Sequence, residues 1–347
     1  TRLGMTVNEK DSVFDVLIPS YRNDIAEEID LIEEVARIYG YNSIKKNYIN
    51  PKISVLNHSE IYLFKENIRK KLSGMGLQEF LTCDLISPKH MDSCLSNYTQ
   101  SSEAILVIKP SSIDQSILRM SLLPGLLEAF KFNQDRQHEN IVAYEIGNIY
   151  YRNQNEFIEK PTLSIGMMGK RNIIDPQIVR QTTDFFDIKG VVQMLLSTLG
   201  VKEAYYNPSC LSSFHPKRQA EIKIDSLLLG YIGEVHPAVL RNIGLSKRVN
   251  FAQLDISQLF QERSLQKNMT PIPMYPSSSR DWTVSIPPTM RYQLIYEAVN
   301  SFKSRILSKW ELLGIYKTDQ CEKVNYTFRF IYQNAKKTLE QHQVDKE

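Results

Sequence analysis

Apolar residues recur with helical spacing in five stretches of the chain. The first stretch repeats them at steps of three and four: Ile25, Ile29, Ile32, Ala36 and Tyr39. This is the spacing of one face of an α-helix. Asp24 stands before the stretch and Glu27 follows three residues later, which predicts a helix with Asp24 as its N-cap. Gly40 predicts its end.

The other four stretches carry similar signals and predict helices over residues 60–76, 122–133, 184–200 and 291–307. Pro124 suits a first helical turn, and Asp184 is a natural N-cap for the third of these helices.

Strand patterns alternate irregularly with these helices. Short apolar runs predict strands over residues 14–20, 104–110, 140–151, 161–169, 220–225, 227–235, 281–286, 310–317 and 324–332. The polar pair Asp225 and Ser226 separates two of the runs and predicts a hairpin turn. Because no regular βαβ alternation is present, we expect an α+β fold with a mainly antiparallel sheet.

Three regions follow one another along the chain. Residues 1–45 and 46–265 form the first two predicted domains, and a polar, proline-rich segment over 264–279 predicts a linker to the third, 271–347. In this last region the order strand, helix, strand, strand is the beginning of a ferredoxin-like βαββαβ unit, and the chain stops before its second helix and fourth strand.

Composition is that of an ordinary globular protein. The 347 residues include 42% hydrophobic and 23% charged residues, and the net charge is +3. The whole positive excess falls within residues 271–347, which hold 11 Lys and Arg against 8 Asp and Glu. This surplus is a weak indication of a phosphate-bearing partner. No apolar run is long enough for a membrane span, and the scattered cysteines favour a reducing cytoplasm.

Motifs for independent catalysis are missing. The sequence has no dinucleotide or P-loop fingerprint, and nothing nominates a nucleophile beside His215 or His236. The four cysteines lack zinc-site spacing. Arg119 could bind an anion or pair with a carboxylate.

Two charge clusters remain as candidate binding residues. Asp24, Asp30, Glu33 and Glu34 lie within eleven residues on the predicted first helix and at its start. They could hold Mg²⁺, which prefers oxygen ligands, or could form a solvated acidic face. In the last region, a set of basic residues could face RNA or be solvated: Arg280, Lys303, Arg305, Lys309, Lys317, Arg329, Lys336 and Lys337.

Several segments resemble the beta subunit of bacterial-type phenylalanyl-tRNA synthetases. LIPSYRNDIAEEIDLIEEVARIYGYNSI resembles the end of its B5 domain. ILRMSLLPGLLEAFKFNQ, AYEIGNIY, FFDIKG, HPKRQA and IGEVHPAVL resemble its catalytic-like module, and YPSSSRDWTV, LLGIYK and KTLEQHQV its ferredoxin-fold anticodon-binding domain. The chain is therefore expected to contain a partial B5 domain, a class II synthetase-like antiparallel sheet flanked by helices, and an incomplete ferredoxin-like domain.

The resemblance implies a function that the residues alone do not. Such enzymes join phenylalanine to tRNA(Phe) with ATP; the alpha subunit binds ATP and phenylalanine, and two alpha and two beta subunits form a heterotetramer. This chain would support the alpha subunit without catalysing the reaction, would contact tRNA in the cytoplasm, and would not contact membranes. Its family-like Mg²⁺ ligands are Asp24, Asp30, Glu33 and Glu34, and its expected RNA-binding residues are Arg280, Lys317, Arg329, Lys336 and Lys337.

Departures from the family pattern limit this expectation. The segments that would carry the editing domain are absent from the sequence, so no proofreading is assigned. The alternative is a free-standing nucleic-acid-binding module without an enzymatic partner.

Overall fold

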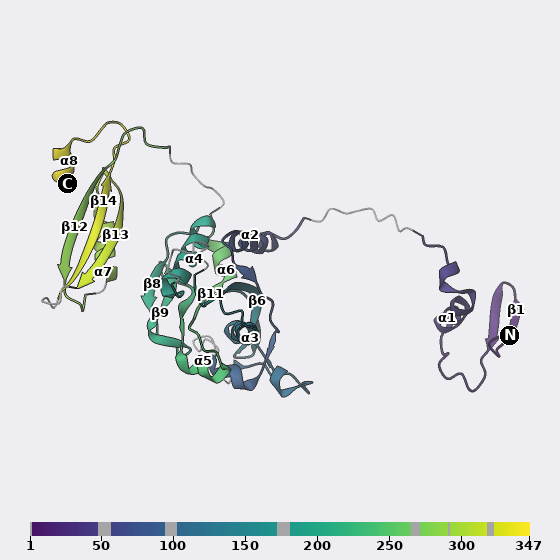
Figure 1. Cartoon of the computed structure of the whole chain (residues 1–347). Coiled ribbons are helices and arrows are strands. Elements are labelled where there is room, and N and C mark those ends of the chain that lie inside the picture. The colour runs from purple at the N-terminus through teal and green to yellow at the C-terminus, as the bar shows by residue number, and fades with distance from the viewer. Residues whose placement is uncertain are drawn as a thin grey trace. The chain divides into compact units, whose positions relative to one another are not determined.

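The computed structural model describes residues 2–47, 57–93, 103–171, 181–264, 271–290, 292–317 and 323–347. The chain divides into two compact units, Thr1–Glu60 and Ile61–Glu347. Figure 1 shows the helices and strands of both. No helix in these described ranges combines the length and the apolar character needed to cross a bilayer.

The first unit contains a hairpin and a helix. Strands β1 (Thr6–Lys10) and β2 (Val13–Leu17) pair antiparallel, and helix α1 (Glu28–Tyr39) is followed by the 3₁₀ turn η1 (Tyr41–Ser43). The hairpin turn places both of its non-glycine residues, Asp11 and Ser12, at positive φ, as type I′ turns require. β2 confirms part of the strand predicted over residues 14–20.

The predicted start of the first helix was wrong. Glu27, not Asp24, is the N-cap of α1, and Asp30 at the third helical position completes the capping box. The Asp30 carboxylate accepts hydrogen bonds from the N–H groups of Ala26 and Glu27, at 2.8 and 2.9 Å. Asp24 is bound instead by Arg22. The predicted end at Gly40 is confirmed.

A seven-stranded sheet forms the centre of the second unit. Its strand order is β3-β6-β7-β11-β10-β9-β8, and every neighbouring pair except β3 and β6 is antiparallel. In sheet order the strands are β3 (Gln78–Glu79), β6 (Ile141–Asn153), β7 (Glu156–Met168), β11 (Val249–Asp255), β10 (Leu227–Val235), β9 (Phe214–Ile224) and β8 (Tyr205–Pro208). The mainly antiparallel sheet predicted from the sequence is confirmed.

Helices cover both faces of this sheet. One face packs against α2 (Glu60–Gly74), α4 (Phe185–Thr198) and α6 (Ile256–Glu262), and the other against α3 (Leu123–Gln134) and α5 (Pro237–Ile243). The strands supply both cores by alternation: Leu163 and Ile165 join the first cluster, whereas Met168 joins the second. Each fully buried aliphatic side chain of this kind stabilises the fold by roughly 1.5–3 kcal/mol.

Local signals placed several of these elements correctly. Asp184 caps α4 and accepts hydrogen bonds from the N–H groups of Phe186 and Asp187.

The strand predicted over 104–110 was wrong, because Leu106 forms only an isolated bridge there. The side chains of Leu106 and Ile108 are exposed and find no sheet to pack on. Shorter elements complete this part: β4 (Leu85–Ile86), β5 (Ile117–Leu118), η2 (Pro88–Ser93) and η4 (Ile113–Gln115).

The C-terminal part forms a separate three-stranded antiparallel sheet with the order β12-β14-β13. Its elements are β12 (Ser278–Ile286), α7 (Tyr292–Ser301), β13 (Leu307–Lys317), β14 (Val324–Tyr332) and α8 (Gln341–Asp345). Phe328 is buried at its centre, where it contacts the rings of Tyr292 and Trp310. The predicted order strand, helix, strand, strand is confirmed. The short helix α8 follows β14, so the expectation that the chain stops before a second helix was wrong.

Two boundaries in the C-terminal part differ from prediction. Helix α7 ends at Ser301 rather than near residue 307, because the Ser304 hydroxyl accepts hydrogen bonds from the N–H groups of Ile306 and Leu307 and turns the chain into β13. Ser278 and Ser279, assigned to the linker from the sequence, belong to β12.

Candidate functional site

The four predicted metal ligands lie on α1 and just before it. Arg22 reaches two of them: its Nη2 lies 2.7 Å from Asp24 Oδ2 and 3.1 Å from Glu34 Oε1. Arg37 also pairs with Glu34, at 2.6 Å. The two carboxylates are therefore neutralised by guanidinium groups of the same unit.

These contacts shift the ionisation of the carboxyl groups. The hydrogen bonds from Arg22 lower the pKa of Asp24 to about 2. Hydrogen bonds from the backbone at Ala26 and Glu27 lower the pKa of Asp30. Those from Arg37 and Arg22 lower the pKa of Glu34. All three carboxyl groups are therefore stabilised as anions. The groups that stabilise them are arginine side chains or backbone N–H groups, not a metal ion.

The carboxylates do not form a coordination set as they lie. Within the described ranges, no group of three or more His, Cys, Asp or Glu side chains is arranged to hold a metal ion. Asp30 turns its Oδ2 towards the start of its own helix, whereas Arg22 lies between Asp24 and Glu34. The residues present therefore do not fit Mg²⁺ in this arrangement, which requires near-octahedral oxygen ligation.

An apolar groove lies beside these acids in the first unit. It has a volume of about 950 Å³ and lies between the β1–β2 hairpin and α1, where it is lined mostly by apolar residues that include Val7, Phe14, Ile32, Val35 and Ile38. The helix buries none of its residues, and the side chains of Ile32 and Val35 are 54% and 66% exposed. Exposed apolar side chains gathered along one helix can serve as a contact surface for another polypeptide.

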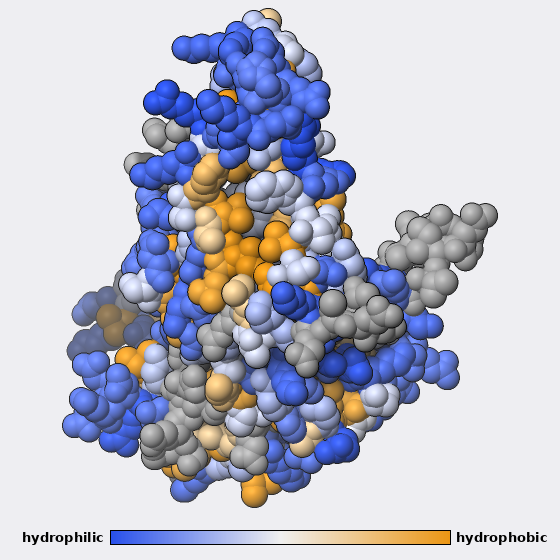
Figure 2. Space-filling view, turned by 90° about the vertical axis from the view of Figure 1, so that its left-hand side faces the viewer, coloured by the Kyte–Doolittle hydropathy of each residue, from blue (hydrophilic) through white to orange (hydrophobic). Residues whose placement is uncertain are grey.

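Apolar side chains also reach the surface in other parts of the chain. Figure 2 shows them as orange areas among hydrophilic residues. In the C-terminal part the exposed ones include Trp282, Leu294 and Ile315.

The five predicted RNA-binding residues are spread over the C-terminal part. Arg280 bonds Asp345, at 2.9 Å, and Arg329 forms a two-pronged pair with Asp281, at 2.8 Å for both bonds. Lys317 ends β13, whereas Lys336 and Lys337 follow β14.

The sheet separates the three lysines. Lys317 lies opposite Val324, at the beginning of β14, and Lys336 and Lys337 come after its last residue, Tyr332. At about 3.3 Å per residue, the length of β14 is roughly 26 Å. The structure thus places these positive charges at two ends of one sheet, and their role in RNA binding stays a prediction.

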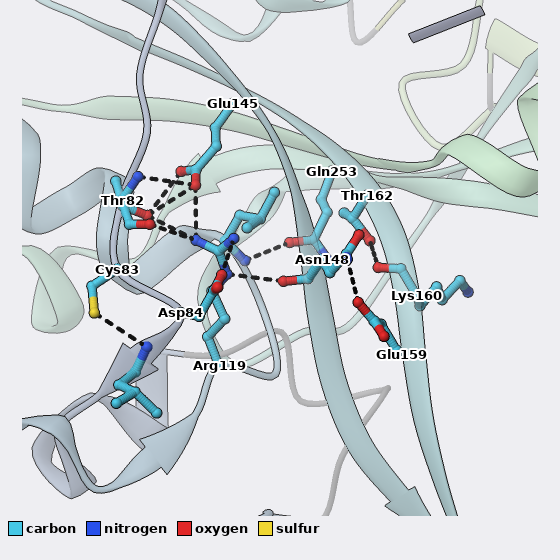
Figure 3. Close-up of polar contacts among 12 residues, drawn as sticks. Thr82, Cys83, Asp84, Arg119, Glu145, Asn148, Glu159, Lys160, Thr162 and Gln253 are labelled. Atoms are coloured by element: carbon cyan, nitrogen blue, oxygen red, sulfur yellow. Dashed lines mark hydrogen bonds and ion pairs between the residues drawn. The ribbon is translucent and has the colours of Figure 1, made fainter. Parts of the chain in front are cut away.

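Arg119 is the centre of a buried polar cluster in the part of the chain that contains the seven-stranded sheet, which we call the sheet domain. Figure 3 shows this cluster. Its guanidinium lies 2.8 Å from Glu145, 2.7 Å from Asp84 and 2.9 Å from the carbonyl oxygen of Asn148. The side chains of Arg119 and Glu145 are 4% and 1% exposed. Of the two interpretations of Arg119, pairing with carboxylates is confirmed.

Polar contacts continue on the neighbouring strands. Gln253 accepts hydrogen bonds from the hydroxyl and N–H groups of Ser121 and Leu122. Lys160 pairs with Asp255 at 2.8 Å. These contacts link neighbouring strands of the sheet, and Lys160, Thr162 and Gln253 enclose no open cavity.

Sequence reasoning missed two surfaces. It did not find the groove of the first unit. Val35 and Ile38, which line this groove, stand between the apolar positions that were used to predict the helix. It also missed a pocket where β9, β10 and α5 meet, because its residues are far apart in sequence. Cys83 and Cys210 are free thiols, while Cys94 and Cys321 lie outside the described residues.

Comparison with known proteins assigns successive parts of the chain to domains of aminoacyl-tRNA synthetases. Residues 1–41 match the tRNA synthetase B5 domain, residues 44–256 the phenylalanyl tRNA synthetase beta chain CLM domain, and residues 273–347 the ferredoxin-fold anticodon binding domain. The chain is thus of the synthetase class. It belongs to the phenylalanyl-tRNA synthetase beta chain family, as the resemblance predicted.

Curated relatives agree with this family. The chain is 39% identical to the phenylalanine–tRNA ligase beta subunit of Protochlamydia amoebophila, over 96% of this chain and 42% of that protein. It is 30% identical to that of Chlamydia caviae and 31% to that of Clostridium acetobutylicum, in both cases over 99% of this chain and 43% of the relative. The chain therefore spans about two fifths of the length of these relatives. A solved pyrrolysyl-tRNA synthetase of Desulfitobacterium hafniense aligns with 60% of this chain and 70% of its own, at 14% identity and a TM-score of 0.48.

Proposed function

We propose that the chain acts as part of the beta subunit of a phenylalanine–tRNA ligase. In this role it supports an alpha subunit that binds ATP and phenylalanine, and it contacts tRNA(Phe) without catalysing the reaction itself. The observation that carries the proposal is the succession of the three matched domains, which follow one another along almost the whole chain.

The apolar groove supports assembly with a second polypeptide. The groove of about 950 Å³ and the exposed apolar side chains of α1 together offer a surface on which a second polypeptide could pack. Obligate subunit interfaces commonly bury more than about 2,000 Å² and are rich in apolar surface. We propose the alpha subunit as the partner and a heterotetramer of two alpha and two beta subunits as the assembly, in the cytoplasm.

The buried cluster around Arg119 supports a non-catalytic role. Arg119 is paired with Glu145 and Asp84 of the same chain, and no open cavity remains among Lys160, Thr162 and Gln253 beside it. A catalytic site instead presents its reactive side chains to an open pocket. The sheet domain would then serve as scaffold, while Lys317, Lys336 and Lys337 are the predicted RNA contacts that lack a described carboxylate partner.

Magnesium at Asp24, Asp30, Glu33 and Glu34 stays a prediction. Because Arg22 lies between two of these carboxylates, the ion would bind only after Asp24 and Glu34 turned away from it. Isothermal titration with Mg²⁺ tests this: Arg22→Gln should bind the ion more tightly than the original chain. Equal affinities would show that Arg22 does not block the site.

Reconstitution tests the proposed function. Purified alpha subunit is mixed with a beta subunit that contains this chain, and complex formation and phenylalanine transfer to tRNA are measured. We expect Ile32→Glu, within the groove, to weaken the complex strongly. Ile29→Glu makes the same change on the same helix, at a residue that does not line the groove, and should act less.

The outcomes separate the two functions considered. Loss of complex and of phenylalanine transfer in Ile32→Glu alone supports the subunit role. A chain that binds nucleic acid but never binds the alpha subunit would be the free-standing module instead.

A further inference from the structure

A pocket of about 330 Å³ opens where β9, β10, α5 and the segment after α5 meet. Helix α5 ends at Gly244, whose φ of 84° turns the chain back towards β11. This turn brings residues 245–248 beside the strands. The charged and titratable residues that line the pocket are His215, Arg218, Glu234, Arg241, Lys247 and Arg248.

Positive charge dominates the lining. Four of these residues are arginine or lysine, and one is a carboxylate. Lys247 is neutralised by Glu139, which lies outside the lining. Arg241 stands in the last turn of α5, and it has no ion pair with any residue in the described ranges. An arginine left in this state is available to an external anion.

Glu234 arranges two further arginines along one wall. Its side chain is only 7% exposed, and its Oε2 accepts a hydrogen bond of 2.7 Å from Arg218. Its Oε1 lies 3.8 Å from Nε of Arg248, whose side chain is 64% exposed. One buried carboxylate thus faces two guanidinium groups, so the wall keeps a net positive charge. The carboxylate also restricts the orientations of both groups before any ligand arrives.

We propose that this pocket binds a phosphate group of an RNA strand. The planar guanidinium group donates two parallel hydrogen bonds, which match the oxygen atoms of a phosphate. Three arginines around one open pocket can contact a phosphodiester and its neighbours along the strand. The inference rests on the proposed function for its choice of RNA, and it adds a contact on the sheet domain to those predicted on the C-terminal sheet.

Affinity for RNA tests the inference. Fluorescence anisotropy with a labelled tRNA transcript and the 347-residue chain gives the dissociation constant at several KCl concentrations. Each lost phosphate contact lowers the salt slope by about 0.9, which corresponds to roughly an eightfold loss of affinity at 0.1 M salt. We expect this loss for Arg241→Gln and a larger one for Arg241→Glu.

Arg152 provides the matched control. It lies near the end of β6, does not line the pocket, and donates hydrogen bonds to the carbonyl oxygen of Gln154 and to Asn155 Oδ1. Arg152→Glu should change the affinity less than twofold, and circular dichroism should show that all variants remain folded. Inorganic phosphate added as competitor should weaken RNA binding to the original chain more than to Arg241→Gln.

Three results overturn the inference. Equal losses in Arg241→Glu and Arg152→Glu would indicate general attraction of charge. Unchanged affinity in both Arg241 variants would exclude the pocket. Phosphate that stabilises the chain without competing with RNA would make the pocket a site for free anions. If a beta subunit that contains the original chain supports aminoacylation with the alpha subunit while the Arg241 variants bind tRNA normally, only this inference fails, and the proposed function stands.

Discussion

Glu145→Ala should destabilise the sheet domain by about 4 kcal/mol. The Glu145 carboxylate, 1% exposed, bonds Arg119 at 2.8 Å and accepts hydrogen bonds from the N–H and hydroxyl groups of Thr82, at 3.1 and 2.9 Å. The substitution leaves the Arg119 guanidinium buried without this partner, at a cost of roughly 3–5 kcal/mol. The carboxylate of Asp84, which is half exposed, compensates only a part of that loss.

Two spectroscopic signals separate the domains in this experiment. The two tryptophans of the chain, Trp282 and Trp310, both lie in the C-terminal sheet. Tryptophan fluorescence therefore reports that sheet, while far-UV circular dichroism is weighted towards the larger sheet domain. In urea, the circular dichroism transition of Glu145→Ala should shift by about 4 kcal/mol, or by roughly 8–16 °C in a thermal scan. The fluorescence transition should not move.

Two further variants make the reasoning refutable. Asp84→Ala removes the half-exposed partner of Arg119 and should cost less than about 1 kcal/mol. Replacing Arg119 and Glu145 together by methionine should recover stability relative to Glu145→Ala, because no buried charge remains unpaired. A Glu145→Ala loss no larger than that of Asp84→Ala would show that the buried pair does not hold the sheet.

Three further predictions concern Gly147, Arg22 and Phe328. Gly147→Ala would place a methyl group 2.3 Å from the Arg119 guanidinium and should cost about 1–3 kcal/mol in urea denaturation, whereas Gly74→Ala, with no atom within 4 Å, should not destabilise the domain. Arg22→Gln should raise the pKa of the Asp24 carboxyl from about 2, as measured by NMR titration. Because the folded-state pKa is depressed, the ion pair contributes stability above about pH 4, and this contribution is lost as the pH falls towards 2. An unchanged pKa in the variant would contradict this reasoning. Phe328→Ala, at a residue only 1% exposed, should lower the stability of the C-terminal sheet by about 3–5 kcal/mol in the fluorescence transition, and no shift there would refute its central place.

Much of the fold could be predicted because its signals are local. Asp184 with Asp187 three residues later marks the start of α4, and both residues act as the capping box requires. The turn at Asp225, where φ is 51°, joins β9 and β10 as its polar character predicted. Alternation in β14 likewise separates the buried side of Phe328 from the side that carries Arg329.

Elements that depend on distant partners were not predictable in the same way. Strand β11 (Val249–Asp255) is buried along its whole length between β7 and β10, so it shows no alternation of polar and apolar residues. The segment 104–110 has the reverse property: its apolar residues resemble a strand, yet it forms only an isolated bridge, from Leu106 to Ile117, and the side chains of Leu106 and Ile108 stay exposed. Pairing in a sheet is decided by residues far away in sequence.

The acidic residues of the first unit show the same limit for a binding site. Their spacing determines only that several carboxylates share a short stretch. A metal ion, an arginine side chain, backbone N–H groups or water can each stabilise such carboxylates, and the sequence pattern is identical in all of these cases. Arg22 precedes Asp24 by two residues, but its reach to Glu34 depends on how the chain turns before α1. Which cation neutralises the acids is therefore a property of the folded unit, and the pKa of Asp24 is the quantity that reports it.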